Sequence, residues 1–257
     1  MTQLTVLSAN LKNPYFSSWR VDRSALLARL EAFARLAEGA AADIVLCQEV
    51  GRGQALRVDE WLAGRLGLAA VYARANGGPR LGREEGLAIL SRYPLRDRRE
   101  TLLAGGLWRR PALGAVAETP LGEITVYTAH LSLRPRRDRR GVARLRAWVE
   151  ATTGARPALI GGDFNAGEDA PHIAALGAPS TGGPGWIDAF RAANPAAEGA
   201  THELRLLGWA VRRRRLDYLF LRPGTQQLRI ATCEHITSPG ASFSDHLAVV
   251  GRLTGGD

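Results

Sequence analysis

The sequence predicts an α/β (α+β) fold, a four-layer α/β/β/α sandwich in which two packed mixed β-sheets are flanked by helices. Short apolar runs separated by turn residues recur along the chain, two long segments have helical spacing, and one β-α-β pattern occurs twice. We expect residues 1–257 to form a single domain, because layered folds of this length often share one core.

The apolar runs have the length and the flanking turn residues of buried strands. The expected strands are Leu4–Asn10, Asp43–Glu49, Gly86–Arg92, Glu123–His130, Pro157–Asn165, Leu216–Arg222 and His246–Leu253. No apolar run approaches the roughly 20 residues of a membrane-spanning helix, so we expect no integral membrane segment.

Two segments carry apolar residues at the spacing of one helix face. The first, about Val21 to Glu38, has Asp22 near its start and Gly39 just past its end, as helix termini prefer. The second, about Arg136 to Thr152, has an apolar stripe and an arginine stripe, and we expect the arginines to face solvent.

The β-α-β pattern predicts two related halves. Leu4–Leu11 is similar to Ile124–Leu131, and each is followed by a helix and then by a strand that ends in an acid, Glu49 or Asp163. Two such halves would pack their sheets face to face with the helices outside. Ligands of α/β folds bind at the carboxyl ends of strands, so we expect one site where these ends converge.

The formal net charge of +9 suits a polyanionic partner. Lys12 is the only lysine, so a coding bias towards arginine is an alternative explanation of the excess. Cys47 and Cys233 are too few for a disulfide framework or a cysteine-rich zinc site. No leader with an apolar segment follows Met1, and we expect a cytoplasmic protein.

Polar side chains gather where the expected strands end and just before the last strand. They are Asn10, Glu49, His130, Asp163, Asn165, Ser244, Asp245 and His246. One such residue is common in turns, but this number is hard to explain by turns alone. Most are hard oxygen donors, without a cysteine cluster or an HExxH helix, so the set favours Mg²⁺ or Mn²⁺ over zinc.

The stretch PALIGGDFNAGED, Pro157–Asp169, carries two of these residues at a strand tip. If strand pairing persists to Asn165, Asp163 and Asn165 point to the same face, because side chains alternate along a strand. A carboxylate would then lie beside a carboxamide.

Short motifs follow one another along the chain in the order CQE, EGLAILSRYP, TAHL, GGDFN, RLDYLF and SDH. In this order they resemble the endonuclease/exonuclease/phosphatase superfamily, which includes pancreatic-type deoxyribonuclease, abasic-site endonucleases, neutral sphingomyelinases and inositol polyphosphate 5-phosphatases. Each motif is weak, but their conjunction is specific and covers nearly the whole chain. The resemblance implies a metal-dependent phosphoesterase.

The resemblance also implies roles for the matching residues. Glu49 matches the main metal-ligating glutamate, with Asn10 and Asp245 as direct or water-mediated ligands. Asp163 and Asn165 match the pair that contacts the scissile phosphate and the attacking water.

Two histidine and acid pairs complete the implied site. His246 matches the histidine that activates water or stabilises the pentacovalent phosphate, and Asp217 matches the acid that orients it. His130 matches the proposed general acid, and Glu85, or the adjacent Glu84, matches the acid that orients His130. A histidine can exchange a proton near neutral pH while its carboxylate partner fixes the tautomer.

A nuclease acting on DNA is the leading hypothesis for the activity. Arg134 and Arg136 follow TAHL directly, and we expect them to bind substrate. His130 stands where abasic-site endonucleases typically have tyrosine, which argues against a repair enzyme of that kind. The alternatives are a phosphoesterase for a phospholipid head group or small phosphorylated metabolite, and a catalytically inactive binding module.

Substrate specificity should depend on loops, expected at Arg74–Gly82, Leu103–Pro111 and Asp169–Gly185. Arg212–Arg215 is expected either to line the cleft or to form a charged strand edge. The remaining histidines match no motif and should occupy ordinary surface or loop positions; they are His172, His202 and His235. Tryptophans in loop-like stretches are candidates for base stacking or for burial; they are Trp108, Trp186 and Trp209.

Overall fold

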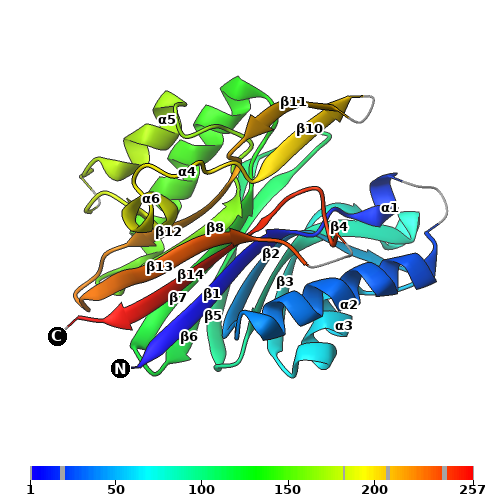
Figure 1. Ribbon diagram of the computed structural model, residues 1–257, viewed down its shortest axis with the longest axis horizontal. Helices are drawn as coiled ribbons and strands as arrows, with labels where there is room; N and C mark the ends of the chain where they lie inside the picture. The colour runs from blue at the N-terminus through cyan, green and yellow to red at the C-terminus, as the bar shows by residue number, and fades with distance from the viewer. Residues whose placement is uncertain (1, 18–20, 182, 207–208, 239–241, 257) are drawn as a thin grey trace.

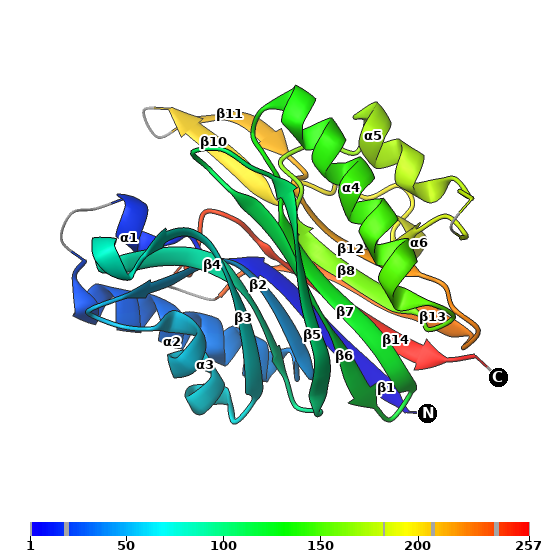
Figure 2. The same cartoon turned by 180° about the vertical axis from the view of Figure 1, so that it is seen from behind.

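Two six-stranded mixed sheets lie face to face, and helices cover the outer face of each sheet (Figure 1). Figure 2 shows the same layers from behind. This computed structural model describes residues 2–17, 21–181, 183–206, 209–238 and 242–256. The predicted four-layer sandwich is confirmed.

The first sheet contains the N-terminal and C-terminal strands. Its strands are β1 (Gln3–Asn10), β2 (Ile44–Gly53), β3 (Ala69–Gly78), β4 (Arg83–Ser91), β13 (Leu228–Ile236) and β14 (Ala248–Gly255). They lie in the order β13-β14-β1-β2-β4-β3. Helices α2 (Arg23–Gly39) and α3 (Val58–Leu66) cover the outer face, and the short helix α1 (Pro14–Ser17) contacts β2 and β4.

The second sheet has helices α4 (Pro135–Thr153), α5 (Pro171–Ala174) and α6 (Ala189–Ala193) on its side of the molecule. Its strands are β5 (Leu95–Ala104), β6 (Arg110–Thr119), β7 (Gly122–His130), β8 (Ala158–Asp163), β9 (Ile187–Asp188) and β12 (Asp217–Arg222), in the order β5-β6-β7-β8-β12-β9. A separate hairpin pairs β10 (His202–Leu206) with β11 (Trp209–Arg214).

In the described part of the chain, no helix is both long and apolar enough to cross a membrane.

The two halves share one pattern of strand pairing. Strand β1 pairs antiparallel with β14 and parallel with β2, which pairs antiparallel with β4. Strand β7 likewise pairs antiparallel with β6 and parallel with β8, which pairs antiparallel with β12. Because α2 and α4 connect the parallel pairs, the carboxyl ends of β1, β2, β7 and β8 lie at the same end of the sandwich (Figure 1).

Helix α2 shows why the local sequence forms its element. Asp22 accepts hydrogen bonds from the backbone N–H groups of Ser24 and Ala25, which caps the first turn. Its apolar stripe, which includes Leu26, Leu30 and Phe33, is buried against the first sheet.

Some strands were missed by the sequence analysis because they lie at exposed edges. The strand β5, for example, has exposed side chains from Arg96 to Glu100, so it lacks a buried apolar run. The expected loops Arg74–Gly82 and Leu103–Pro111 are partly wrong, since strand residues of β3, β5 and β6 occupy their ends.

The sheets approach closely beneath the carboxyl ends of the strands. A Cβ atom added to Gly161 on β8 would lie 2.6 Å from Leu46 Cδ1 and 2.9 Å from Ser8 Cβ, both on the opposite sheet. In the same layer, Gln48 Nε2 donates a hydrogen bond to Thr128 Oγ1 across the sheets at 2.9 Å. The glycine therefore lets the two strand-end clusters meet.

We expect the change Gly161→Ala to lower the free energy of unfolding by roughly 1–3 kcal/mol, because the added methyl group overpacks the space between the sheets. Urea denaturation followed by circular dichroism measures this. Gly64→Ala on α3 is the control: a Cβ there meets no atom within 4 Å, and alanine should stabilise the helix slightly. Equal stability of Gly161→Ala and wild type would contradict this packing.

Candidate active site

The side-chain amide of Asn10 connects the strand ends of both sheets. Asn10 Nδ2 donates to Glu49 Oε1 at 3.1 Å in the first sheet and to Asp163 Oδ2 at 3.0 Å in the second. Asn10 Oδ1 accepts from the backbone N–H of Lys12 at 2.9 Å, which fixes the orientation of the amide. The structure thus brings together three of the predicted site residues.

Glu49 lies at a bulge within β2. The sequence analysis predicted that it lies at the end of the strand, which is wrong. The pairing of β2 with β4 shifts between Cys47 and Val50, and Glu49 has a φ of 51° in the left-handed region. Bulges often turn a side chain towards a functional site. Glu49 Oε2 accepts from the backbone N–H of Asn13 at 3.0 Å, so both carboxylate oxygens are oriented.

His246 lies between two buried carboxylates. Its Nδ1 is 2.8 Å from Asp217 Oδ2, and its Nε2 is 3.9 Å from Asp163 Oδ2. Thr201 Oγ1 donates to the same Asp217 oxygen at 2.6 Å. Burial opposes the charged imidazole, but Asp217, Asp163 and Asp245 outweigh it and raise the pKa of His246 to about 9.

Asp163 is itself a perturbed acid. Burial and the neighbouring Asp217 raise its pKa, against the opposing effects of His246, the Asn165 backbone N–H and Asn10. Asp163, Asp217 and His246 also offer ligand atoms that lie within 4.8 Å of one another.

His130, at the end of β7, has the opposite surroundings. Its Nδ1 is 3.0 Å from a guanidinium nitrogen of Arg110, and its Nε2 is 3.6 Å from Asp163 Oδ2. An arginine only donates hydrogen bonds, so Nδ1 accepts and the ring proton is on Nε2. Burial, Arg110 and His246 hold the pKa of His130 well below its ordinary value.

Glu85 is not in contact with His130, because Arg110 lies between them. Glu85 Oε1 is 3.7 Å from the same Arg110 nitrogen that approaches His130. Burial and Glu49 raise the pKa of Glu85 to about 7, although Arg110 opposes the shift. Sequence reasoning missed Arg110, which is the first residue of the unpredicted strand β6 and belongs to no motif.

Asn165 reaches the site by a turn and not by strand alternation. Strand β8 ends at Asp163, and Asn165 has a left-handed φ of 52°, so the expected continuation of the strand is wrong. The backbone N–H of Asn165 donates to Asp163 Oδ1, and its Nδ2 donates to Leu131 O, each at 2.9 Å. The carboxamide is therefore held next to the carboxylate by hydrogen bonds.

The metal ligands implied by the resemblance are only partly assembled. Glu49 and Asn10 are in contact, whereas Asp245 Oδ2 forms an ion pair with Lys12 Nζ at 3.0 Å. Glu49 keeps unshared lone pairs on oriented oxygens and is partly exposed, which suits a hard divalent cation. The donor set therefore fits Mg²⁺ or Mn²⁺ at Glu49.

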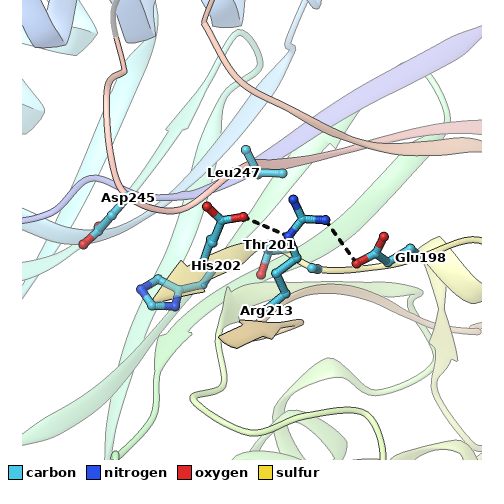
Figure 3. A pocket seen from close by; sticks show the side chains of 8 residues that line it. Glu198, Thr201, His202, Arg213, Asp245 and Leu247 are labelled. Atoms are coloured by element: carbon cyan, nitrogen blue, oxygen red, sulfur yellow. Dashed lines mark hydrogen bonds and ion pairs between the residues drawn. The ribbon is translucent and has the colours of Figure 1, made fainter. Parts of the chain in front are cut away.

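His202, which the sequence analysis assigned to an ordinary position, packs against His246 with ring centroids 4.7 Å apart. A cavity of about 400 Å³ lies beside the site, and its lining includes His202, Asp245 and Arg213 of β11. Figure 3 shows these side chains. Arg213 is held there by ion pairs to Glu203 at 2.8 Å and Glu198 at 3.7 Å. The hairpin thus forms one wall of the site.

The other predicted positions vary in their surroundings. Arg134 is exposed at the start of α4, and the side chain of Arg136 lies outside the described residues. His172 contacts Asp138, and His235 stacks on Phe190. Trp186 is buried, whereas Trp108 and Trp209 are exposed.

The sequence profile of the Endonuclease/Exonuclease/phosphatase family matches residues 7–246, so the chain belongs to this family. Its members are phosphoesterases that generally depend on divalent metals. No curated protein matches the chain.

Solved structures with the same fold cover nearly the whole chain. An endonuclease/exonuclease/phosphatase from Bacteroides vulgatus is 19% identical, with a TM-score of 0.77 and complete coverage of both chains. TDP2 of D. rerio with a single-strand DNA product is 16% identical, with a TM-score of 0.75 over 99% of this chain and 100% of that chain. The human Nocturnin catalytic domain with a bound sulfate is 18% identical, with a TM-score of 0.75 over 99% and 94%.

We expect nitrogen-15 NMR at neutral pH to show His130 as the neutral tautomer with its proton on Nε2. Arg110→Leu should mix the tautomers and raise the pKa of His130, because it removes both a donor to Nδ1 and a positive charge. Arg109→Leu, at the exposed neighbouring position, is the control. An unchanged His130 spectrum in Arg110→Leu would contradict the contact.

Proposed function

We propose that this protein is a divalent-metal-dependent phosphodiesterase that acts on nucleic acid, and specifically a nuclease of DNA. The observation that carries the proposal is the series of contacts from Glu49 through Asn10 and Asp163 to His246 and Asp217. The series offers hard oxygen donors at one end and a charged imidazole at the other. A phosphodiester bound between them would meet a cation on one side and a proton donor on the other.

Glu49 would hold the cation, with Asp245 as a further ligand once it leaves Lys12. Asn10, whose two N–H groups face the carboxylates, orients Glu49 here and would become a ligand only after its amide turns to present Oδ1. When bound, Mg²⁺ or Mn²⁺ neutralises negative charge on a phosphate oxygen. Arg29 Nη2 donates to Lys12 O at 2.9 Å. This hydrogen bond helps to hold the backbone between Asn10 and Asn13 in place.

Asp163 and Asn165 would orient the attacking water. The raised pKa of Asp163 suits a carboxylate that accepts a proton, because a base works best when its pKa is near the operating pH. His246, which is charged between its two carboxylates, would donate a hydrogen bond to the phosphate and stabilise its negative charge.

His130 would act as a hydrogen-bond donor through its Nε2–H group. A histidine that acts as a general acid is protonated on both ring nitrogens before it transfers a proton. Arg110 donates to Nδ1 of His130, so this nitrogen accepts and carries no proton. This contact supports phosphate binding by His130 instead of the general-acid role that the family resemblance implies.

Charge supports a nucleic-acid substrate. The chain has a formal charge of +9. Exposed Arg134 begins α4 just after β7, and exposed Arg212 lines a cavity together with Asn165. The fold neighbour TDP2 has been solved with a single-strand DNA product, which supports DNA among the possible polyanions.

EDTA should abolish hydrolysis of plasmid DNA, and Mg²⁺ or Mn²⁺ should restore it. Glu49→Ala should raise the metal concentration needed for half-maximal activity and also lower the rate, because it removes the main oxygen ligand. Glu60→Ala is the matched control, because Glu60 on α3 is an exposed carboxylate that forms an ion pair with Arg57. Restoration by zinc alone, or a wild-type metal requirement in Glu49→Ala, would overturn the proposal.

His130→Ala should slow two substrates by similar factors, each by roughly 10² to 10³. The substrates are a thymidine dinucleotide, with a sugar alkoxide as leaving group, and a p-nitrophenyl ester of thymidine 5′-phosphate. A phosphate-binding donor matters for both, whereas a general acid matters mainly for the poor leaving group. A much larger loss on the dinucleotide would assign proton transfer to His130 and reject the donor role.

A further inference from the structure

A second cavity adjoins the candidate active site at Asn165. It has a volume of about 620 Å³ and extends from Asn165 to the pair formed by Asp138 on α4 and His172 on α5. Its opposite wall is the segment Arg212–Arg215, which includes the end of β11. We call this space the Asn165–His172 cavity.

One wall of this cavity presents two arginines that are free to bind an anion. Arg213 pairs with Glu203 and Glu198, and Arg215 pairs with Glu168 and Asp188. Arg212 and Arg214, in contrast, form no ion pair with any residue in the described ranges. They lie two positions apart on β11, so their side chains leave the same face of the strand.

The other wall presents an imidazole held by a buried carboxylate. His172 Nε2 is 2.5 Å from Asp138 Oδ2, and the side chain of Asp138 is only 3% exposed. A carboxylate that contacts one ring nitrogen orients the ring and leaves the other ring nitrogen available to a ligand.

One carboxylate oxygen of Asp138 lacks a hydrogen bond, although the other oxygen contacts His172. Asp138 Oδ1 is buried and has no hydrogen-bond partner among the described residues. A buried polar atom without a partner costs about 1–3 kcal/mol. The contact with His172 alone therefore does not satisfy the carboxylate of Asp138, which lines the cavity.

We propose that the Asn165–His172 cavity is a second phosphate subsite, which binds a phosphate next to the scissile one in a substrate that carries at least two. Arg212 and Arg214 would contact this phosphate from β11, and His172 would contact it from α5. Asp138 is a positioning residue that acts through His172. The inference rests on the proposed phosphodiesterase function, and it specifies the substrate as a strand of linked phosphates rather than a simple monoester.

Binding of product analogues in the presence of EDTA, which prevents hydrolysis of the dinucleotide, tests the subsite without turnover. Isothermal calorimetry compares thymidine 5′-monophosphate with thymidine 3′,5′-bisphosphate and with the 5′-phosphorylated dinucleotide that ends in a 3′-phosphate. The wild-type protein should bind at least one of the longer ligands roughly tenfold more tightly, as expected for one additional charge-assisted contact. Equal affinity for all three ligands would overturn the proposal.

Variants assign this gain to the cavity. Arg212→Ala, Arg214→Ala and His172→Ala should each reduce the affinity ratio towards one, and Asp138→Asn should reduce it less, because the ring stays in place. Arg35→Ala, which removes an exposed arginine on α2, is the charge-matched control and should keep the ratio. A wild-type ratio in Arg212→Ala and Arg214→Ala, with thermal unfolding unchanged, would reject the subsite.

Inositol 1,4-bisphosphate distinguishes a nucleic-acid strand from a phosphorylated metabolite as the source of the second phosphate. A gain for this ligand that equals the nucleotide gain would support the subsite and reject a strand-specific substrate. If the protein hydrolyses no diester but keeps the affinity ratio and its loss in the variants, the phosphodiesterase proposal fails and the subsite stands. If diesters are hydrolysed but the ratio is one, the subsite fails and the phosphodiesterase proposal stands.

Discussion

The candidate site depends on one buried amide. Asn10 Nδ2 has two N–H groups, and it donates them to Glu49 on one sheet and to Asp163 on the other. Without this donor, Glu49 at the bulge of β2 and Asp163 at the end of β8 would lose their shared partner, which is costly for the buried carboxylate of Asp163. The bridge also requires that the sheets approach closely, and Gly161 and the hydrogen bond from Gln48 to Thr128 provide this approach directly beneath it.

Around this bridge, the pKa values of two histidines are shifted in opposite directions. His246 faces Asp217 and Asp163, so its pKa is raised and its ring is charged at neutral pH. Burial and the guanidinium of Arg110 lower the pKa of His130, and the contact with Arg110 confines its proton to Nε2. The charge of the nearest partner therefore decides what each ring can do, and a single site can hold a charged donor and a neutral donor on either side of Asp163.

The sequence predicted most of the buried frame of the fold. Strands β1, β7 and β8 were recognisable because their side chains are buried on both faces and form continuous apolar runs. Helices α2 and α4 were recognisable from the spacing of their buried faces. The edge strand β5 was missed because its exposed side chains are charged, and the hairpin β10–β11 was missed because it lies outside both sheets.

The sequence by itself determined which residues arrive at the strand ends, because the alternation of apolar and turn residues places Asn10 and Asp163 there whatever their partners are. Only the tertiary structure decided which side chains meet. It placed Arg110 between Glu85 and His130, brought His202 against His246, and turned Glu49 at a bulge. These contacts depend on the register of neighbouring strands and on the packing of one sheet against the other, which relate segments far apart in the chain and leave no signal in local sequence patterns.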